Sequence, residues 1–236
     1  MGEGIFAQKC GLVAVDLVAA CGVLTPEQLA GLARLVQEVQ TFRVKMTSRQ
    51  TMVVVLPSEK VPALLAGLPS LGLQVSPYGN VVRAVKGCAG NAALCPRAIA
   101  NALDLAIELQ DKYLGQEVPK DFKIAVAGCP RGCVDPHCAD FGLMASGQDV
   151  YDVIIGGIGG SKNPLHGQLI ARRVSGEKAQ KLLDHVLARF RELGQPREKL
   201  GRTIQRVGLD KFLPPTELTE GEPEKPAADF MKFLQE

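Results

Sequence analysis

Hydrophobic and polar positions recur at two different spacings along the first 80 residues, and both predict regular structure. Residues 5–18 carry closely spaced apolar side chains, which favour extended structure. TPEQLAGLARLVQEVQ (25–40) opens with a capping box and a proline at the first helical position, and its leucines follow a helical stripe. FRVKM (42–46) and TMVVVLP (51–57) predict two strands joined by the polar TSRQ.

A second helix and a short strand complete this unit. Ser58 is expected to cap a helix that runs to Leu68, and LQVS (73–76) follows as a short extended segment. The order strand, helix, strand, strand, helix, strand is that of the split βαβ, or ferredoxin-like, arrangement. We therefore predict a ferredoxin-like half-domain over residues 1–80.

The pattern changes near Val81, where longer helices alternate with buried strands. RAIANALDLAIELQDKYLG (97–115), which Pro96 begins, and GEKAQKLLDHVLARFRELG (176–194) predict helices. Continuous apolar runs predict strands at FKIAVAG (122–128), FGLMAS (141–146) and VYDVIIGG (150–157). The fold class is therefore α+β, with an α/β domain over 81–212 after the half-domain.

The segment after Phe212 has a different composition from the rest of the chain. PPTELTEGEPEKPAADF is rich in proline and glutamate, which predicts an extended, solvated C-terminal tail over residues 213–236. Its last residues, FMKFLQE, also have the pattern of a short helix that docks on a partner. A solvated tail is the preferred interpretation.

Composition excludes several classes of protein. A net charge of +2 lacks the basic surplus of nucleic-acid-binding proteins, and the absence of Trp with only 3 Tyr leaves few residues to stack on bases. No apolar run approaches the ~18 residues of a membrane span. Seven cysteines in 236 residues are too sparse for a disulfide scaffold. They favour reduced thiols or thiolate metal ligands in a cytoplasmic protein.

Four of these cysteines form two pairs at glycine-containing loops. GCAGNAALCP (87–96) holds Cys88 and Cys95 six residues apart, and CPRGC (129–133) holds Cys129 and Cys133. Four thiolates are what a [4Fe–4S] cluster requires, and backbone N–H groups near glycines and helix starts stabilise its negative charge.

Other interpretations of the cysteines stay open on spacing alone. Structural zinc prefers pairs separated by two to four residues, so the six-residue gap is loose for zinc. Redox-active or inert thiols would explain Cys10 and Cys21 more readily than they explain two pairs beside Gly and Pro. Cys138 is a fifth candidate, which keeps the ligand set from being unique. The spacing favours the cluster.

Several segments in order carry a resemblance to a known family. They are GVLTPEQL (22–29), VKMTSRQ (44–50), GCAGNAALCPRAI (87–99), VPKDFKIAVAGCPRGC (118–133), ADFGLMASG (139–147), VIIGGIGG (153–160) and GLDKF (208–212). The chain resembles the siroheme-dependent sulfite and nitrite reductases. Its length is similar to that of the small type with a single copy of the repeat, in which a ferredoxin-like half-domain precedes the siroheme and [4Fe–4S] domain.

The resemblance implies two cofactors and a set of residues that hold them. It makes Cys88, Cys95, Cys129 and Cys133 the cluster ligands, with Cys133 also bridging to the siroheme iron. Siroheme carries eight carboxylates, so its pocket should be basic. The implied siroheme-binding residues are Lys45, Arg49 and Arg131, with Gln50 and Asn91 as neutral donors; Arg83, Lys86, Arg97, Lys123 and Lys162 are further basic candidates.

The resemblance also implies a small anionic substrate. Arg49 and Lys123 match two of the four cations that surround the anion in sulfite-reducing members, and these two are the implied catalytic residues. Asp121 replaces the third cation, and the fourth falls near Asp16. The expected function is reduction of sulfite or nitrite. The alternative is a non-catalytic redox or tetrapyrrole-binding protein that has lost part of the anion site.

The implied partners follow from what the sequence lacks. GGIGG (156–160) has no convincing Rossmann context, so no flavin- or nicotinamide-binding fingerprint is visible. Electrons are therefore expected from a separate, ferredoxin-like donor protein. Larger relatives pack two repeats about a pseudo-two-fold axis, which a homodimer of this chain would recreate.

Overall fold

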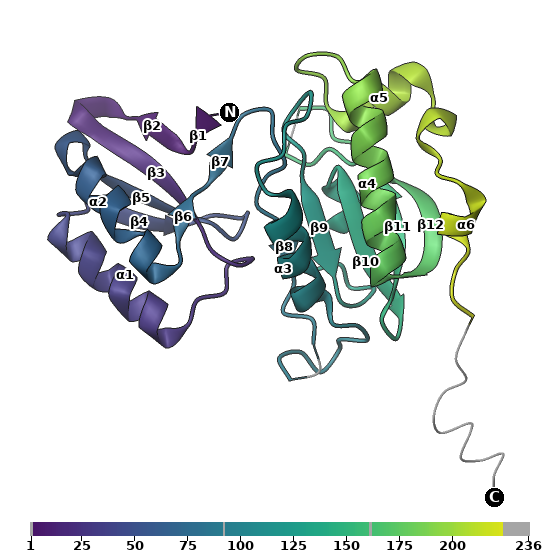
Figure 1. Cartoon of the computed structure of the whole chain (residues 1–236), viewed down its shortest axis with the longest axis horizontal. Helices are drawn as coiled ribbons and strands as arrows, with labels where there is room; N and C mark the ends of the chain where they lie inside the picture. The colour runs from purple at the N-terminus through teal and green to yellow at the C-terminus, as the bar shows by residue number, and fades with distance from the viewer. Residues whose placement is uncertain (1, 92, 161, 224–236) are drawn as a thin grey trace, which may run out of the picture.

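The computed structural model describes residues 2–91, 93–160 and 162–223, which form two lobes. Figure 1 shows the first lobe, in purple and blue, beside the second, in teal to yellow. Each lobe has a β-sheet with helices packed on it, and the chain crosses between them after β7 (Pro77–Tyr78). This arrangement confirms the α+β class.

The first lobe has the predicted ferredoxin-like order. Its sheet runs β2-β3-β5-β4, with β6 also paired to β3, and all of these pairs are antiparallel. The elements are β2 (Ile5–Ala7), β3 (Leu12–Val18), α1 (Pro26–Glu38), β4 (Arg43–Met46), β5 (Met52–Pro57), α2 (Val61–Gly67) and β6 (Gln74–Val75). Both halves of the capping box at Thr25 and Gln28 are formed.

The apolar stretch 5–18 forms two strands rather than one extended segment. A short 3₁₀ turn at Lys9–Gly11 reverses the chain, so β2 pairs back onto β3. Cys10 and Gly11 both have positive φ, at 59° and 72°, which supplies the tight left-handed turn. Apolar periodicity does not reveal this reversal, because both strands are apolar and only four residues, 8–11, separate them.

Within the sheet of the first lobe, β3 is buried on both faces. Val15 and Leu17 of β3 are fully buried in a core with Leu32 of α1 and Leu64 of α2. Side chains alternate along a strand, so Asp16 points to the opposite face, and it is only 8% exposed. A carboxylate is therefore buried on the face away from the helices.

The second lobe contains a mixed five-stranded sheet in the order β12-β11-β10-β9-β8. The pairs β8–β9 and β9–β10 are parallel, and the remaining two are antiparallel. The elements are β8 (Lys86–Gly87), α3 (Ala102–Tyr113), β9 (Ile124–Ala127), β10 (Phe141–Gly147), β11 (Val150–Ile155), β12 (Gln168–Ser175), α4 (Gly176–Leu193) and α5 (Leu200–Val207). Phe122, Phe141 and Phe190 are fully buried in its core.

Helix α3 begins later than Pro96, where the sequence places its start. Its first residue is Ala102, and the side chain of Asn101 accepts the N-capping hydrogen bond from Asp104. The preceding residues bond to other loops instead: Ile99 N–H donates to Gly128 O, and Ala102 N–H donates to Gly90 O. Those contacts fix the cysteine-containing segment in a non-helical path.

The first residues beyond Phe212 lie against the second lobe. The short helix α6 (Thr216–Thr219) contacts β12 and α4, Lys178 Nζ donates to Glu220 O, and Glu222 N–H donates to Arg173 O. They do not form the extended, solvated segment that composition predicts. FMKFLQE lies outside the described residues. Among the described residues, no helix has the length and hydropathy needed to cross a membrane.

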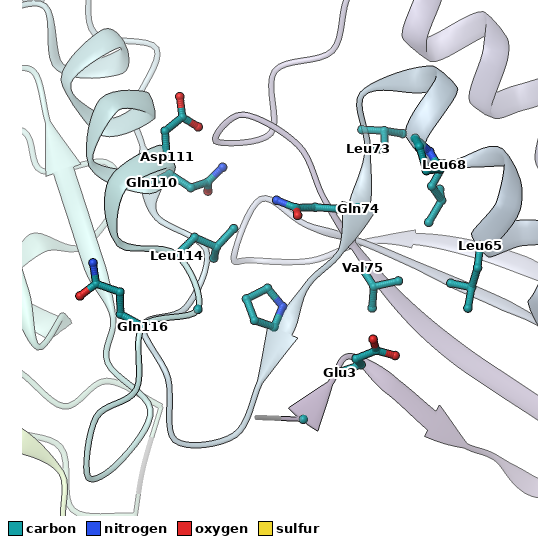
Figure 2. Close-up of a pocket in the computed structure, with 14 residues that line it drawn as sticks. Glu3, Leu65, Leu68, Leu73, Gln74, Val75, Gln110, Asp111, Leu114 and Gln116 are labelled. Carbon is teal, nitrogen blue, oxygen red and sulfur yellow. The ribbon is translucent and has the colours of Figure 1, made fainter.

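Two glutamines join the lobes through backbone hydrogen bonds. Gln50, which follows β4, exchanges two bonds with Gly87 of β8, at 2.7 and 2.9 Å. Gln110 of α3 is buried; its Nε2 donates to Ala19 O and its Oε1 accepts from Val85 N–H. Figure 2 shows Gln110 at the edge of a groove of about 1040 Å³ between the lobes.

The substitution Gln110→Leu should destabilise the protein, because it leaves Ala19 C=O and Val85 N–H buried without partners. Each such loss typically costs ~1–3 kcal/mol, so we expect the free energy of unfolding to fall by about 2–5 kcal/mol in urea titrations. The matched control is Gln37→Leu on the exposed face of α1. Equal unfolding midpoints for the two variants would show that Gln110 does not hold the lobes together.

Candidate functional site

The two cysteine loops lie against each other at the carboxyl ends of β8 and β9. Gly90 and Gly128 make the contact: a Cβ on Gly90 would lie 2.9 Å from Gly128 Cα and 2.7 Å from Cys88 Sγ. Gly128 N–H donates to Cys88 Sγ at 3.0 Å. Any side chain at either glycine would push the loops apart.

Three of the four predicted ligands influence one another electrostatically. Burial raises the pKa of the Cys88 thiol; the N–H groups of Gly128 and Gly90 oppose that rise, and Cys129 and Cys133 add to it. Cys95 closes its own turn, where Ala98 N–H donates to its carbonyl. All four residues therefore belong to adjoining loops.

The thiols do not yet converge on one point. Within the part of the chain that the structure describes, no group of three or more His, Cys, Asp or Glu side chains is placed to hold a metal ion. The donors nevertheless suit an iron–sulfur cluster: they are unbridged thiols, Cys133 is exposed, and Cys88 already accepts a backbone N–H. Those residues fit the cluster by the chemistry of their donors.

A cavity of about 300 Å³ lies next to these loops and receives residues from both lobes. Ser48 and Arg49 come from the β4–β5 turn of the first lobe, and Lys123 comes from the residue before β9. The rest of the lining is Lys86, Ile124, Ala125, Val134, Asp135, Cys138, Ala139, Gly159 and Gly160. Lys86 forms an ion pair with Asp135 at 3.1 Å. The cavity is therefore basic on the side of Arg49 and Lys123.

Two guanidinium groups act on each other here: Arg49 lines the cavity, and Arg83 lies near Arg49 outside that lining. Burial lowers the pKa of Arg49, and the nearby positive charge of Arg83 lowers it further. Arg49 Nη1 and Arg83 Nε are buried and find no hydrogen-bond acceptor among the described residues. Arg83 is held in place by stacking on Tyr78, 4.3 Å from the ring centre. Buried donors of like charge create a site for an anion.

Lys123 completes the cluster of cations. Burial lowers the pKa of its ammonium, and the charges of Arg49 and Lys199 lower it further. Among the described residues, no carboxylate lies within ion-pair distance of its Nζ. The structure thus brings Arg49 and Lys123, the two predicted catalytic residues, together with Arg83.

Acidic residues lie around these cations. Asp16 and Asp140 are both buried, and Oδ1 of each lacks a hydrogen-bond partner in the described chain. Asp140 Oδ2 accepts from Lys199 Nζ and from the backbone of Lys123. Asp140 lies in ADFGLMASG, one of the segments that carry the resemblance, whereas Lys199 does not stand out in the sequence, because its partners are brought near only by the fold.

The remaining predicted cofactor-binding residues fall into two groups. Lys45 and Arg131 are exposed, and Lys45 Nζ donates to Met46 O at 3.1 Å. Gln50 and Asn91 are already engaged with backbone: Gln50 with Gly87, and Asn91 Oδ1 with the N–H groups of Ala93 and Leu94. In this structure these two amides shape the loops around the cavity.

The larger groove between the lobes has a different character. Among the described residues, its lining contains no cysteine, lysine or arginine; it includes four leucines, three glutamines, Glu3 and Asp111. The smaller cavity contains the predicted catalytic residues Arg49 and Lys123.

Comparison with known proteins identifies the family. Residues 78–223 match the model of the nitrite and sulphite reductase 4Fe-4S domain, and residues 6–70 match the nitrite/sulfite reductase ferredoxin-like half domain. This chain belongs to that family. It is an oxidoreductase of the sulfite and nitrite reductase type, with a [4Fe–4S] cluster and siroheme as its cofactors.

Individual relatives differ in how much of them the chain spans. The assimilatory-type sulfite reductase of Nitratidesulfovibrio vulgaris is 25% identical over 191 residues, which are 80% of this chain and 85% of that protein. The large subunit of the Escherichia coli NADH nitrite reductase is 28% identical over 182 residues, 76% of this chain but 21% of the subunit.

A solved structure supports the fold independently. The crystal structure of dissimilatory sulfite reductase I superposes with a TM-score of 0.77 at 15% identity, over 92% of this chain and 73% of that one. At this level of identity the match shows the shared fold.

Replacing a cluster ligand should remove iron without unfolding the chain. We expect Cys129→Ser to lose most bound iron and sulfide and the broad visible absorption of the cluster, because a serine oxygen is a poor ligand for a cluster built on thiolates. Cys138→Ser is the matched control, since Cys138 lines the cavity and is outside the predicted ligand set. Equal iron content in the two variants would contradict this ligand assignment.

Proposed function

We propose that this protein reduces sulfite, or nitrite, at the cavity lined by Arg49 and Lys123. The observation that carries the proposal is the group of three partly or fully buried cations at Arg49, Arg83 and Lys123, two of which have buried donors without acceptors. A small oxyanion would satisfy those donors and offset the repulsion between the two guanidinium groups.

In this proposal Cys88, Cys95, Cys129 and Cys133 hold the [4Fe–4S] cluster, and Cys133 also bridges to the siroheme iron. When bound, the two cofactors deliver single electrons to the anion. Lys45 and Arg131 are proposed to bind carboxylates of the macrocycle, because both are exposed and positively charged. Gln50 and Asn91 support the site by fixing Gly87 and the turn between the first two cysteines.

Lys123 has a second proposed role as a proton donor. Reduction of sulfite consumes protons as well as electrons. Burial and the charge of Arg49 lower the pKa of the Lys123 ammonium, so its Nζ releases a proton more readily than an exposed lysine does. Arg49 and Arg83 are proposed to bind the anion.

We propose that the electrons come from a separate, ferredoxin-like protein and that the chain acts in the cytoplasm as a homodimer. The donor is supported by the lack of a nucleotide-binding fingerprint in the sequence, and the compartment by the seven unbridged cysteines. A single copy of the repeat supports the dimer. Sedimentation equilibrium should give about twice the mass of 25.2 kDa; a monomer at micromolar concentration would refute the dimer.

Purification without oxygen tests the proposed reaction. We expect the isolated protein to contain siroheme, and its absorption bands to shift when sulfite or nitrite is added. Reduced viologen should then support turnover of one of the two anions. Bands that neither anion shifts, with no turnover, would refute the reductase.

That negative result would support a second candidate, a non-catalytic redox or tetrapyrrole-binding protein. The observation in its favour is Asp16, a buried carboxylate near Arg49 with an oxygen that has no partner in the described chain. A carboxylate in this place opposes the binding of a second anion.

A further inference from the structure

Lys199 reaches across the second lobe to two carboxylates near the proposed anion site. It precedes α5, yet its ammonium points away from that helix and is only 17% exposed. Its Nζ lies 2.7 Å from Asp140 Oδ2 and 3.4 Å from Asp121 Oδ2, and it also donates to Asp121 O. One lysine therefore joins two acids that are 19 positions apart in the sequence.

Asp140 depends on this lysine. Its side chain is 1% exposed, and burial raises the pKa of the carboxyl, which Lys199 opposes. Its other polar contact is the backbone N–H of Lys123, at 2.9 Å, and Oδ1 finds none in the described chain. Asp121 has one further cation within reach, Lys120 at 3.6 Å. Without Lys199, Asp140 would be a buried charge with no ion-pair partner.

These two carboxylates also act on the cations of the anion site. Asp121 and Asp140 both favour the charged forms of Arg49 and Lys123, and Lys199 and Lys123 repel each other. The further charges that act on Arg49, on Lys123 or on both are those of Arg83, Lys199, Asp16, Asp121 and Asp140, and Lys120 lies beside Asp121. Removing the charge of Lys199 would make the net charge at this junction less positive by one. The two acids would then be free to pair with Lys123 and Arg49 in place of an anion.

We propose that Lys199 is a positioning residue of the anion site, which neutralises Asp121 and Asp140 so that Arg49 and Lys123 remain free for the anion. The inference rests on the proposed function. It adds to that function a cation from a distant segment, Lys199, which lies beside Asp121. Lys199 touches neither anion nor cofactor in this scheme; it acts through the two carboxylates.

Three variants of the cofactor-loaded protein test this role, with sulfite binding measured from the shift in siroheme absorption. Lys199→Met should raise the Kd for sulfite about tenfold, and Asp121→Asn should lower it about tenfold, because each changes the net charge beside the anion by one. The double variant Asp121→Asn with Lys199→Met restores the net charge and should return the Kd to near the wild-type value. Siroheme and iron contents should equal those of the wild type.

Controls separate charge from folding. Lys181→Met removes the same charge from the exposed face of α4 and should leave the Kd unchanged. If Lys199→Met does not fold, Lys199→Gln decides the question, because its amide can still donate to Asp140 while the charge is removed, and a lysine with a purely structural role predicts an unchanged Kd in that variant. Wild-type Kd values in both single variants would overturn the inference while leaving the reductase intact. A wild-type protein that holds both cofactors and binds neither sulfite nor nitrite would overturn both.

Discussion

The burial of several like charges where the two lobes meet is the constraint on which the rest of the structure depends. Desolvation of Arg49 and Lys123 is unfavourable, and their proximity to Arg83 and Lys199 adds repulsion. The protein offsets this cost with three carboxylates from three different segments. Neutral contacts also hold the lobes together: the side-chain amides of Gln50 and Gln110 form hydrogen bonds with backbone groups of the other lobe or of both lobes.

Charged residues form the site and neutral contacts join the lobes, which explains why the site is assembled from both lobes. The first lobe contributes Arg49 on a turn whose next residue, Gln50, is fixed to Gly87. The second lobe contributes Lys123 directly before a buried strand. The backbone beside Arg49 is therefore fixed by neutral contacts, whereas the backbone N–H of Lys123 is held by the Asp140 carboxylate.

Much of the fold can be predicted from the sequence, because the patterns that indicate helices and strands are local. The capping box at Thr25, the helical periodicity of α4 and the apolar runs of β9 to β11 each lie within one element, and the structure contains all of them. The start of α3 and the turn at Cys10 were missed. Both depend on backbone contacts or a left-handed conformation, which residue patterns do not encode. The cysteine pairs were visible because their spacing is local within each loop.

The charged site was only partly predictable, for a related reason. Arg49 and Lys123 lie in segments that resemble the family. Lys199 can be recognised as part of the site only in the folded protein, where α5 packs beside the loop at Asp121. From the sequence alone, a lysine at the polar end of a helix is expected to be an exposed surface residue. Asp121 looked like the loss of a cation, and the structure shows that it already has an ammonium partner. Charge compensation between residues of distant segments arises from the packing of the folded chain.

The contact between Gly90 and Gly128 restricts which substitutions this site tolerates. A Cβ at Gly90 would lie 2.9 Å from Gly128 Cα, and a Cβ at Gly128 would lie 2.9 Å from Gly90 Cα. Even the smallest substitution, to alanine, therefore has to displace one loop from the other. The spacing of the two cysteine pairs is thus set by two residues that have no side chain and supply no ligand.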